Sequence, residues 1–499
     1  MTRYSHLITD ENRKWWTLGA MCFALFMIML DNTVVNVALP SIQRDLDASI
    51  SGLEWTVNGY TLSFAVLLAT GGRLGDIFGR RLMFITGVII FALSSATAGL
   101  APDATALVVS RIVQGVGAAL MMPGTLSIIT DAFPAHERGK AMGTWAGVSA
   151  LALAIGPVMG GFLTEHVSWR AIFYLNIPVA IGAVLATIFA VRESRDESVG
   201  RKVDFAGVGV LTAGLTALVL ALVEGNAWGW GSPQVIGLLA LAAVALPAFV
   251  AVENRVEAPI VQFDLLGDRN FLGAVVVALV ISFAMLGVFF FLALYMQNIL
   301  HYSPLEAGVR FLPSTLMIVA VAPIAGRLSD RFGPRWLIAG GLLILSASLF
   351  SFSGIAVDSG YLDLLPGFML LGFGIALTMS PMTSAAMNAV PVQKAGIASG
   401  VLSMFRMVGG SLGVAITGAI FQASVGSSFE TATPTEFVDG LSLAMTVSAL
   451  VTVVGAVIAI ATIRSRAGKQ TLEAAEAAVN PGGSAVAARE AVAVGDHAV

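Results

Sequence analysis

Fourteen long apolar runs fill most of this 499-residue sequence, and they exclude a soluble fold. Each run is about 18 to 25 residues long, which is the length that a helix needs to cross the ~30 Å hydrocarbon core of a bilayer. Only 12% of the residues are charged, whereas soluble proteins carry about a quarter. We therefore predict an all-α membrane protein with helices near 15–38, 53–73, 82–100, 105–128, 140–163, 169–191, 204–224, 233–253, 271–297, 308–328, 336–354, 363–383, 400–422 and 441–462.

Lysine and arginine are distributed very unevenly between the two sets of gaps that separate these runs. An even number of spans puts both termini on one side, and the gaps and tails of that side hold 22 of the 27 Lys and Arg residues. The opposite gaps hold only Arg44, Arg170 and Arg310. Because positively charged loops stay in the cytoplasm, we expect both termini to be cytoplasmic, in a plasma or inner cell membrane.

Two ten-residue segments in corresponding gaps nearly repeat each other. Residues 72–81 read GRLGDIFGRR and residues 326–335 read GRLSDRFGPR, with seven identical positions. Parallel repeats of this kind form the two halves of many secondary transporters. We therefore predict an internal duplication, with each segment forming a tight turn between two spans.

Three charged residues lie deep within spans, namely Asp31, Arg111 and Arg406. A charge at the centre of a membrane helix costs about 2.5–3.5 kcal/mol on insertion scales, so each is a candidate functional residue. We expect Asp31, Asn32 and Asn36 to form one polar patch that faces the bundle interior. Asp31 is either a carboxylate that gains and loses a proton or a buried acid that pairs with Arg111 for structure alone.

Arg111 and Gln114 are three residues apart and therefore share one helical face. Since an arginine stays protonated, Arg111 either tunes a nearby acid or serves as a polar link between helices. The candidate cavity residues are Asn32, Asn36, Gln114, Tyr295 and Arg406. Tyr295 belongs to an aromatic group that is either a contact surface for lipophilic cargo or a core or lipid-facing stripe, together with Phe289, Phe290 and Phe291.

Two further groups are candidates for conformational gating. Small residues and a proline in the fifth span form either ordinary helix packing or a hinge and tight seam between halves. Asp76 and Arg80 are four residues apart and could clamp a helix end in one conformation, although the arginines there also serve topology. The gating candidates are Gly72, Asp76, Gly79, Arg80, Arg81, Gly156, Pro157, Gly160, Gly161 and Asp330.

Taken together, these segments resemble the major facilitator superfamily, and in particular its drug:proton antiporters with fourteen spans (the EmrB/QacA type). Residues 72–81 resemble the superfamily's signature loop, and residues 156–161 resemble the span-5 motif of exporters. Residues 111–117, 30–40 and 396–410 are similar to the motifs of spans 4, 1 and 13. Two residues depart from the family pattern. Ala152 replaces a glycine of the longer span-5 motif and is expected to keep the packing, whereas Pro334 replaces the first basic residue of the second signature segment, which is therefore expected only to stabilise the fold.

The resemblance implies a major facilitator fold of two six-helix bundles, at 15–191 and 271–462, with two helices at 204–253 inserted between them. Residues 1–14 would be a cytoplasmic N-terminus, 192–203 a cytoplasmic linker and 467–499 a disordered tail.

The implied function is proton-coupled export of lipophilic neutral or monocationic compounds by alternating access. The partners would be protons, small molecules and the lipid bilayer, with no cofactor, metal or nucleic acid, and the chain would act as a monomer. Export of an endogenous metabolite or a self-made antibiotic is an alternative. A membrane-embedded enzyme is disfavoured because the sequence has no clustered nucleophiles, His/Asp metal set or nucleotide-binding loop.

Overall fold

The computed structural model describes residues 9, 12–134, 137–195, 204–256, 259, 261–391, 394–425 and 433–464. Over these residues the chain is almost entirely α-helical, and fourteen spans are long and apolar enough to cross a membrane. The predicted class and number of spans are therefore confirmed for the described part of the chain. The expected tail at 467–499 lies outside it, as do most of the expected linker and of the N-terminal segment.

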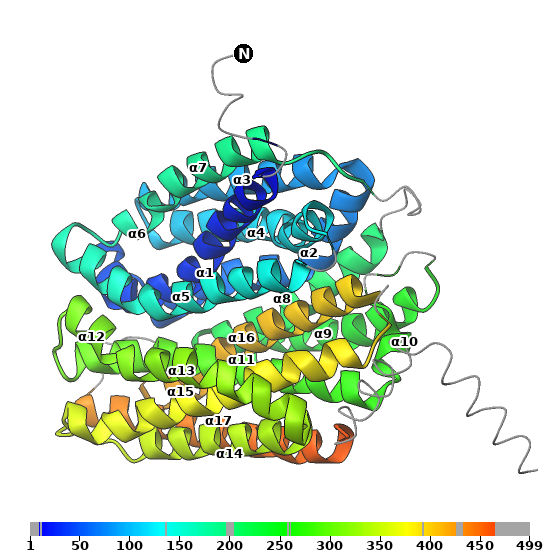
Figure 1. Ribbon diagram of the computed structural model, residues 1–499. Helices are drawn as coiled ribbons and strands as arrows, with labels where there is room; N and C mark the ends of the chain where they lie inside the picture. Colours follow the sequence, from blue (N-terminus) through cyan, green and yellow to red (C-terminus); the bar gives the residue numbers. More distant parts are fainter. Residues whose placement is uncertain are drawn as a thin grey trace, which may run out of the picture.

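The first six spans pack together in the upper half of Figure 1, and we call them the first bundle. Leu175 separates α6 from α7 within a single span, because Pro178 has no N–H to bond with the carbonyl of Tyr174. The helices are α1 (Arg13–Leu46), α2 (Ile50–Phe78), α3 (Arg80–Gly99), α4 (Ala104–Ala132), α5 (Arg138–His166), α6 (Ala171–Tyr174) and α7 (Asn176–Ala190).

The last six spans form the second bundle, in the lower half of Figure 1. One span is again divided, at Phe311, and Pro313 lies just inside the helix that follows. The helices are α10 (Phe263–Leu266), a single turn, then α11 (Arg269–Asn298), α12 (Pro304–Arg310), α13 (Leu312–Phe332), α14 (Pro334–Ser353), α15 (Tyr361–Asn388), α16 (Ala395–Val425) and α17 (Pro434–Thr462).

Two inserted helices, α8 (Phe205–Trp228) and α9 (Pro233–Glu253), pack against each other. Helix α8 also packs against α2 of the first bundle and α16 of the second, so it lies beside the seam between the bundles. Trp55 on α2 donates to Glu224 on α8 at 3.1 Å, and Asn226 on α8 donates to the Ala419 carbonyl at 2.7 Å. The inserted pair is therefore joined to both halves.

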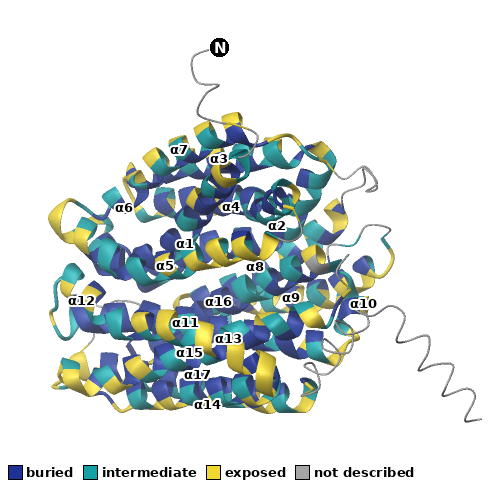
Figure 2. Ribbon diagram, viewed as in Figure 1, coloured by how far each residue is buried: buried dark blue, intermediate teal, exposed yellow. Residues whose placement is uncertain are grey.

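Large apolar side chains lie exposed on the outer surfaces of the helices, including Leu93, Val244 and Val457, which are 64%, 69% and 60% exposed. Figure 2 shows many exposed positions on the outer surfaces of the helices, whereas buried positions predominate inside the bundles. Contiguous apolar surface of this extent is rare on soluble monomers. It is the surface that lipid tails cover in a membrane protein.

The repeated segments at 72–81 and 326–335 are mostly helical, which corrects the prediction of a glycine-rich turn. Helix α2 continues through Gly72 and ends at Phe78, and α13 likewise ends at Phe332. Only the following glycine breaks each helix: Gly79 has φ +124° and Gly333 has φ +82°. Because residues with a side chain rarely adopt such angles, one glycine in each copy makes the turn.

Candidate functional site

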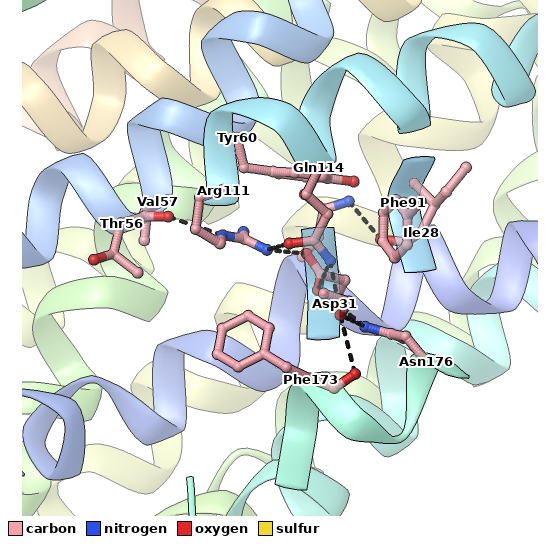
Figure 3. A network of polar contacts seen from close by, with 12 residues as sticks. Ile28, Asp31, Thr56, Val57, Tyr60, Phe91, Arg111, Gln114, Phe173 and Asn176 are labelled. Carbon is pink, nitrogen blue, oxygen red and sulfur yellow. Dashed lines mark hydrogen bonds and ion pairs between the residues drawn. The ribbon is translucent and has the colours of Figure 1, made fainter. Parts of the chain in front are cut away.

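Asp31 and Arg111 form a buried ion pair inside the first bundle. Asp31 lies in the middle of α1 and Arg111 near the start of α4, and each is 1% exposed. Arg111 Nη1 donates to Asp31 Oδ2 in a short contact. Figure 3 shows the two side chains pointing toward each other. The structure therefore brings together the two charges that the sequence singled out in this half.

A network of neutral side chains completes the hydrogen bonding of this pair. Gln114 Nε2 donates to Asp31 Oδ1 at 2.9 Å, and Gln114 Oε1 accepts from Arg111 Nη1 at 2.8 Å. Asn176 on α7 lies 3.5 Å from Asp31 Oδ1 and donates to Ser95 Oγ on α3 at 2.9 Å. The network thus joins four helices around one carboxylate. Sequence analysis missed Ser95 and Asn176, because a neutral polar residue in an apolar run is a weak signal.

The Arg111 guanidinium is held on its other sides as well. Its Nε donates to the Thr56 carbonyl of α2 at 3.0 Å, and its centre lies 4.3 Å from the ring of Tyr60. A second ring, that of Phe173, lies 5.9 Å away. Cation–π contacts of this kind are stronger when they are desolvated. Arg111 is therefore fixed in one position beside Asp31.

A separate cavity lies between the two bundles. Its lining comes from α1, α2, α4 and α5 of the first bundle and from α11, α13, α15 and α16 of the second. Asn32 and Asn36 line it, and Arg406 lines it from the opposite bundle. The expected polar patch is therefore divided, since Asn32 and Asn36 face the cavity whereas Asp31 faces the bundle interior. Adjacent residues on a helix point about 100° apart, which places Asp31 and Asn32 on different faces.

Two predicted cavity residues do not line this cavity. Gln114 belongs to the Asp31 network. Tyr295 is fully buried, and its hydroxyl donates to the Ala356 carbonyl at 2.7 Å. Of the neighbouring aromatic residues, Phe289 lines the cavity, whereas Phe290 and Phe291 are buried in the protein core. The aromatic run therefore contributes one side chain to the cavity, because its members point in different directions around α11.

Arg80 makes the predicted ion pair with Asp76 and a second one with Asp131. Its Nε lies 2.9 Å from Asp76 Oδ1, and its Nη1 lies 2.6 Å from Asp131 Oδ2 at the end of α4. Arg81 Nη2 donates to the Ile188 carbonyl of α7 at 2.9 Å. The start of α3 is thereby tied to α4 and α7. Asp131 was not among the gating residues predicted from the sequence.

The second repeated segment lacks these ties among the residues that the structure describes. Pro334 replaces the residue equivalent to Arg80, and it occupies the first turn of α14, where proline is favourable. Asp330 forms no ion pair with a described residue. The two copies therefore share a helix–turn–helix geometry but differ in their electrostatic contacts.

Helix α5 approaches both α1 and the second bundle through its small residues. A side chain at Gly156 or Gly160 would meet Thr33 and Val34 of α1. A side chain at Gly161 would meet the Pro304 carbonyl of α12, and one at Gly308 would meet the Pro157 carbonyl. The predicted small-residue motif thus lies at the seam between the two bundles.

Among the described residues, the hydrogen bonds between the bundles are concentrated toward one end of the helices. We call the face where α1 begins and α17 ends the terminal face, and the other the opposite face. Near the terminal face, a side chain added at Gly143 or Gly147 of α5 would meet nothing within 4 Å. Four hydrogen bonds between described residues join the bundles between the midplane and the opposite face: Gln297 Nε2 to the Val37 carbonyl (2.8 Å), Leu305 N to Glu165 Oε2 (2.9 Å), Ser411 Oγ to Asn58 Oδ1 (3.0 Å) and Gln422 Nε2 to Glu54 Oε1 (2.8 Å).

Glu54 is a buried carboxylate that sequence analysis missed. It is fully buried at the seam, Gln422 supplies one hydrogen bond, and its Oε2 has no hydrogen-bond partner among the described residues. The residue lies one turn into α2, where hydropathy alone cannot distinguish a helix end in water from one packed against another bundle. Like Asp31, it is an acid that is almost completely shielded from solvent.

Two helix bundles with a cavity between them, and a sealed carboxylate–arginine network in one of them, define a membrane transporter of the two-bundle class. Residues 21–414 match the model of the Major Facilitator Superfamily. The chain belongs to this superfamily.

Curated relatives of this chain include several resistance and export proteins. It is 37% identical to the tetracenomycin C resistance and export protein of Streptomyces glaucescens, over 84% of this chain and 78% of that protein. It is 40% identical to the puromycin resistance protein of Streptomyces alboniger, over 82% of each. It is 36% identical to the multidrug resistance protein Stp of Mycobacterium tuberculosis H37Rv, over 83% of this chain and 77% of that protein.

Among solved structures, the chain resembles a bacterial homologue of the human lysosomal transporter Spinster, crystallised in an inward-facing and unoccupied conformation. The TM-score is 0.64 at 17% identity, over 92% of this chain and 98% of that one. This likeness independently supports the predicted major facilitator fold.

Proposed function

We propose that this protein exports small lipophilic molecules, including antibiotics, in exchange for protons. The named relatives support an export role, because several of them confer resistance to antibiotics or drugs. The observation that carries proton coupling is the position of Asp31, which is sealed against Arg111 directly beside the cavity residue Asn32. A buried carboxylate at such a place can hold a proton in one state and release it in the other.

Alternating access follows from the one-sided contact between the bundles. The excess of lysine and arginine on the terminal side supports a cytoplasmic terminal face. The structure then corresponds to a state that is closed to the outside, with the bundles apart toward the cytoplasm. Asp31 would accept a proton from outside when the bundles separate there, and cargo would leave. The proton would pass to the cytoplasm after the return to the present state.

The membrane potential supplies part of the driving force. One proton that crosses ~100 mV provides about 2.3 kcal/mol. For a neutral cargo exchanged for one proton, this corresponds to a gradient of roughly 50-fold before any contribution from pH. Export of a compound made by the host cell would use the same cycle and remains the alternative cargo.

The test is efflux of a panel of neutral, anionic and cationic fluorescent dyes from cells that express the full chain. We expect efflux of at least one dye, its loss with a protonophore, and its loss in Asp31→Asn. Asp47→Asn is the matched control, because Asp47 is exposed at the end of the same helix with φ 48°, which asparagine adopts readily. Normal efflux by Asp31→Asn at normal membrane abundance would contradict the proposed coupling.

A further inference from the structure

Arg406 is the only charged residue that lines the cavity between the bundles, among the residues that the structure describes. It projects from α16, across the cavity from the first bundle. The other polar side chains of the lining are neutral: Asn32, Thr33, Asn36, Ser282, Thr315 and Ser403. The site where cargo would bind therefore carries one positive charge and no negative charge.

The Arg406 guanidinium has no protein partner among the described residues. Its Nε is buried without a hydrogen bond, and no carboxylate forms an ion pair with it. Arg111 provides the contrast within the same protein, because it bonds Asp31, Gln114 and the Thr56 carbonyl. Buried charges in proteins are normally paired. Arg406 is partly buried and lines the cavity, so a bound molecule with a negative charge would supply the partner that the described protein residues do not.

The remaining lining indicates the shape of that molecule. Phe64 and Phe289 present aromatic rings from opposite bundles. Methionine side chains adapt to irregular apolar ligands and contact aromatic rings favourably. Five methionines line the cavity: Met29, Met122, Met285, Met379 and Met407. The surroundings of Arg406 thus suit an apolar body with aromatic rings, and the Asn32 and Asn36 amides suit its neutral oxygens.

We propose that the preferred cargo is an aromatic monoanion whose carboxylate or ionised phenol binds Arg406. The inference rests on the proposed export function and names the substrate class of that site. A guanidinium offers parallel N–H groups that match a carboxylate, and such charge-assisted pairs are stronger than neutral ones. The singly cationic cargo that sequence analysis allowed is disfavoured, because it would meet an unopposed positive charge.

An anionic cargo also changes the energetics of export. When a monoanion leaves and a proton enters, two charges move in the favourable direction across an inside-negative membrane. Each charge at ~100 mV contributes roughly 50-fold to the attainable gradient, so the pair contributes on the order of 2,000-fold. Transport of the anion would therefore be electrogenic.

Equilibrium binding tests the proposal without requiring transport. The full chain is placed in phosphatidylcholine nanodiscs and titrated with three compounds that share one pyrene ring: pyrenebutyrate, its methyl ester and pyrenebutyl-trimethylammonium. Charge-assisted hydrogen bonds predict that pyrenebutyrate binds about 10- to 100-fold more tightly than the ester, and that the cation binds most weakly. Equal binding of anion and ester by the unmodified protein would overturn the proposal, even if proton-coupled efflux is found.

Arg406→Gln should abolish the preference for the anion and leave ester binding unchanged, which also shows that the variant is folded. Arg310→Gln is the control, because Arg310 does not line the cavity. Its guanidinium lies 3.7 Å from the centre of the Tyr302 ring instead. If Arg406→Gln binds neither compound, Arg406→Lys decides, since the proposal requires it to keep an anion preference. Loss of the anion preference in Arg406→Lys would overturn the proposal. Loss of pyrenebutyrate binding when phosphatidylglycerol is added would also overturn it, because a lipid headgroup would then be the anion that binds Arg406.

Discussion

The Asp31–Arg111 pair has two possible roles, and at the scale of single residues they predict different mutant phenotypes. Breaking a buried ion pair by removing one partner costs about 3–5 kcal/mol, because the other charge stays buried and unpaired. Replacing both partners by neutral groups avoids most of this cost. The Gln114 and Asn176 amides around the pair can also bond to neutral side chains. Stability and transport can therefore be separated.

We expect Arg111→Gln to lower the free energy of unfolding by a few kcal/mol, within the range of about 3–5 for broken buried pairs. Asp31→Asn combined with Arg111→Gln should recover most of this stability, because no unpaired charge remains. Thermal unfolding in detergent reports the change in stability of each variant, and dye efflux reports its transport activity. The double variant should stay inactive if Asp31 carries the proton. Efflux by a stable double variant would leave the pair with a structural role only.

Glu54 and Gln422 give a second prediction at the residue scale. Gln422→Leu would leave the Glu54 carboxyl without its hydrogen bond at the closed seam, which costs about 1–3 kcal/mol for a buried polar group. Because this bond exists only while the bundles meet at the opposite face, its loss should shift the population toward the state open on that side. Faster hydrogen exchange at the start of α2 and the end of α16 would show the shift. Unchanged exchange would mean that the bond does not stabilise closure.

Between elements, the closed seam depends on glycines that allow backbones to touch. A methyl group at Gly161 would collide with the Pro304 carbonyl of α12, and neither group is a flexible side-chain end. We therefore expect Gly161→Ala to slow transport at least several-fold by preventing full closure of the opposite face. Gly182→Ala on α7 is the control, because a side chain there meets nothing within 4 Å. The test compares the efflux rates of cells that contain equal amounts of each variant. Normal efflux by Gly161→Ala would exclude this seam from the transport cycle.

The elements also show what the sequence could and could not predict. The number and approximate position of the spans followed from hydropathy, because the bilayer fixes the length of a helix. Their ends did not follow, since α1 continues past its apolar run to Leu46 and α2 continues to Phe78. Water beyond the bilayer core tolerates polar helix ends. Helices therefore end where Asp47 or Gly79 adopts positive φ.

The charged residues of the site were predicted from the sequence, but their arrangement in space was not. Asp31, Arg111 and Arg406 were identified because a buried charge is costly in lipid. Their distribution over two separate sites depends on helix rotation, which spacing along one helix cannot define. The same limit explains why Tyr295 was placed in the cavity although it bonds the Ala356 carbonyl. Pairing between Glu54 and Gln422 joins residues that are 368 positions apart, beyond any local pattern.

For the whole molecule, the one-sided contact between the bundles predicts which surfaces water can reach from each side. Gly143 near the terminal face has open space around it, and Val167 at the opposite face is 68% exposed. Cys22, the only cysteine in the sequence, can be replaced by serine so that single cysteines can be introduced at these two positions. An impermeant maleimide should label Gly143→Cys only in inside-out vesicles and Val167→Cys only in right-side-out ones. Reversed labelling would place the termini outside and invert the proposed direction of export.

Labelling of Gly143→Cys should also fall when an outward-open state is populated, as in Gln422→Leu, because the bundles must then meet at the terminal face.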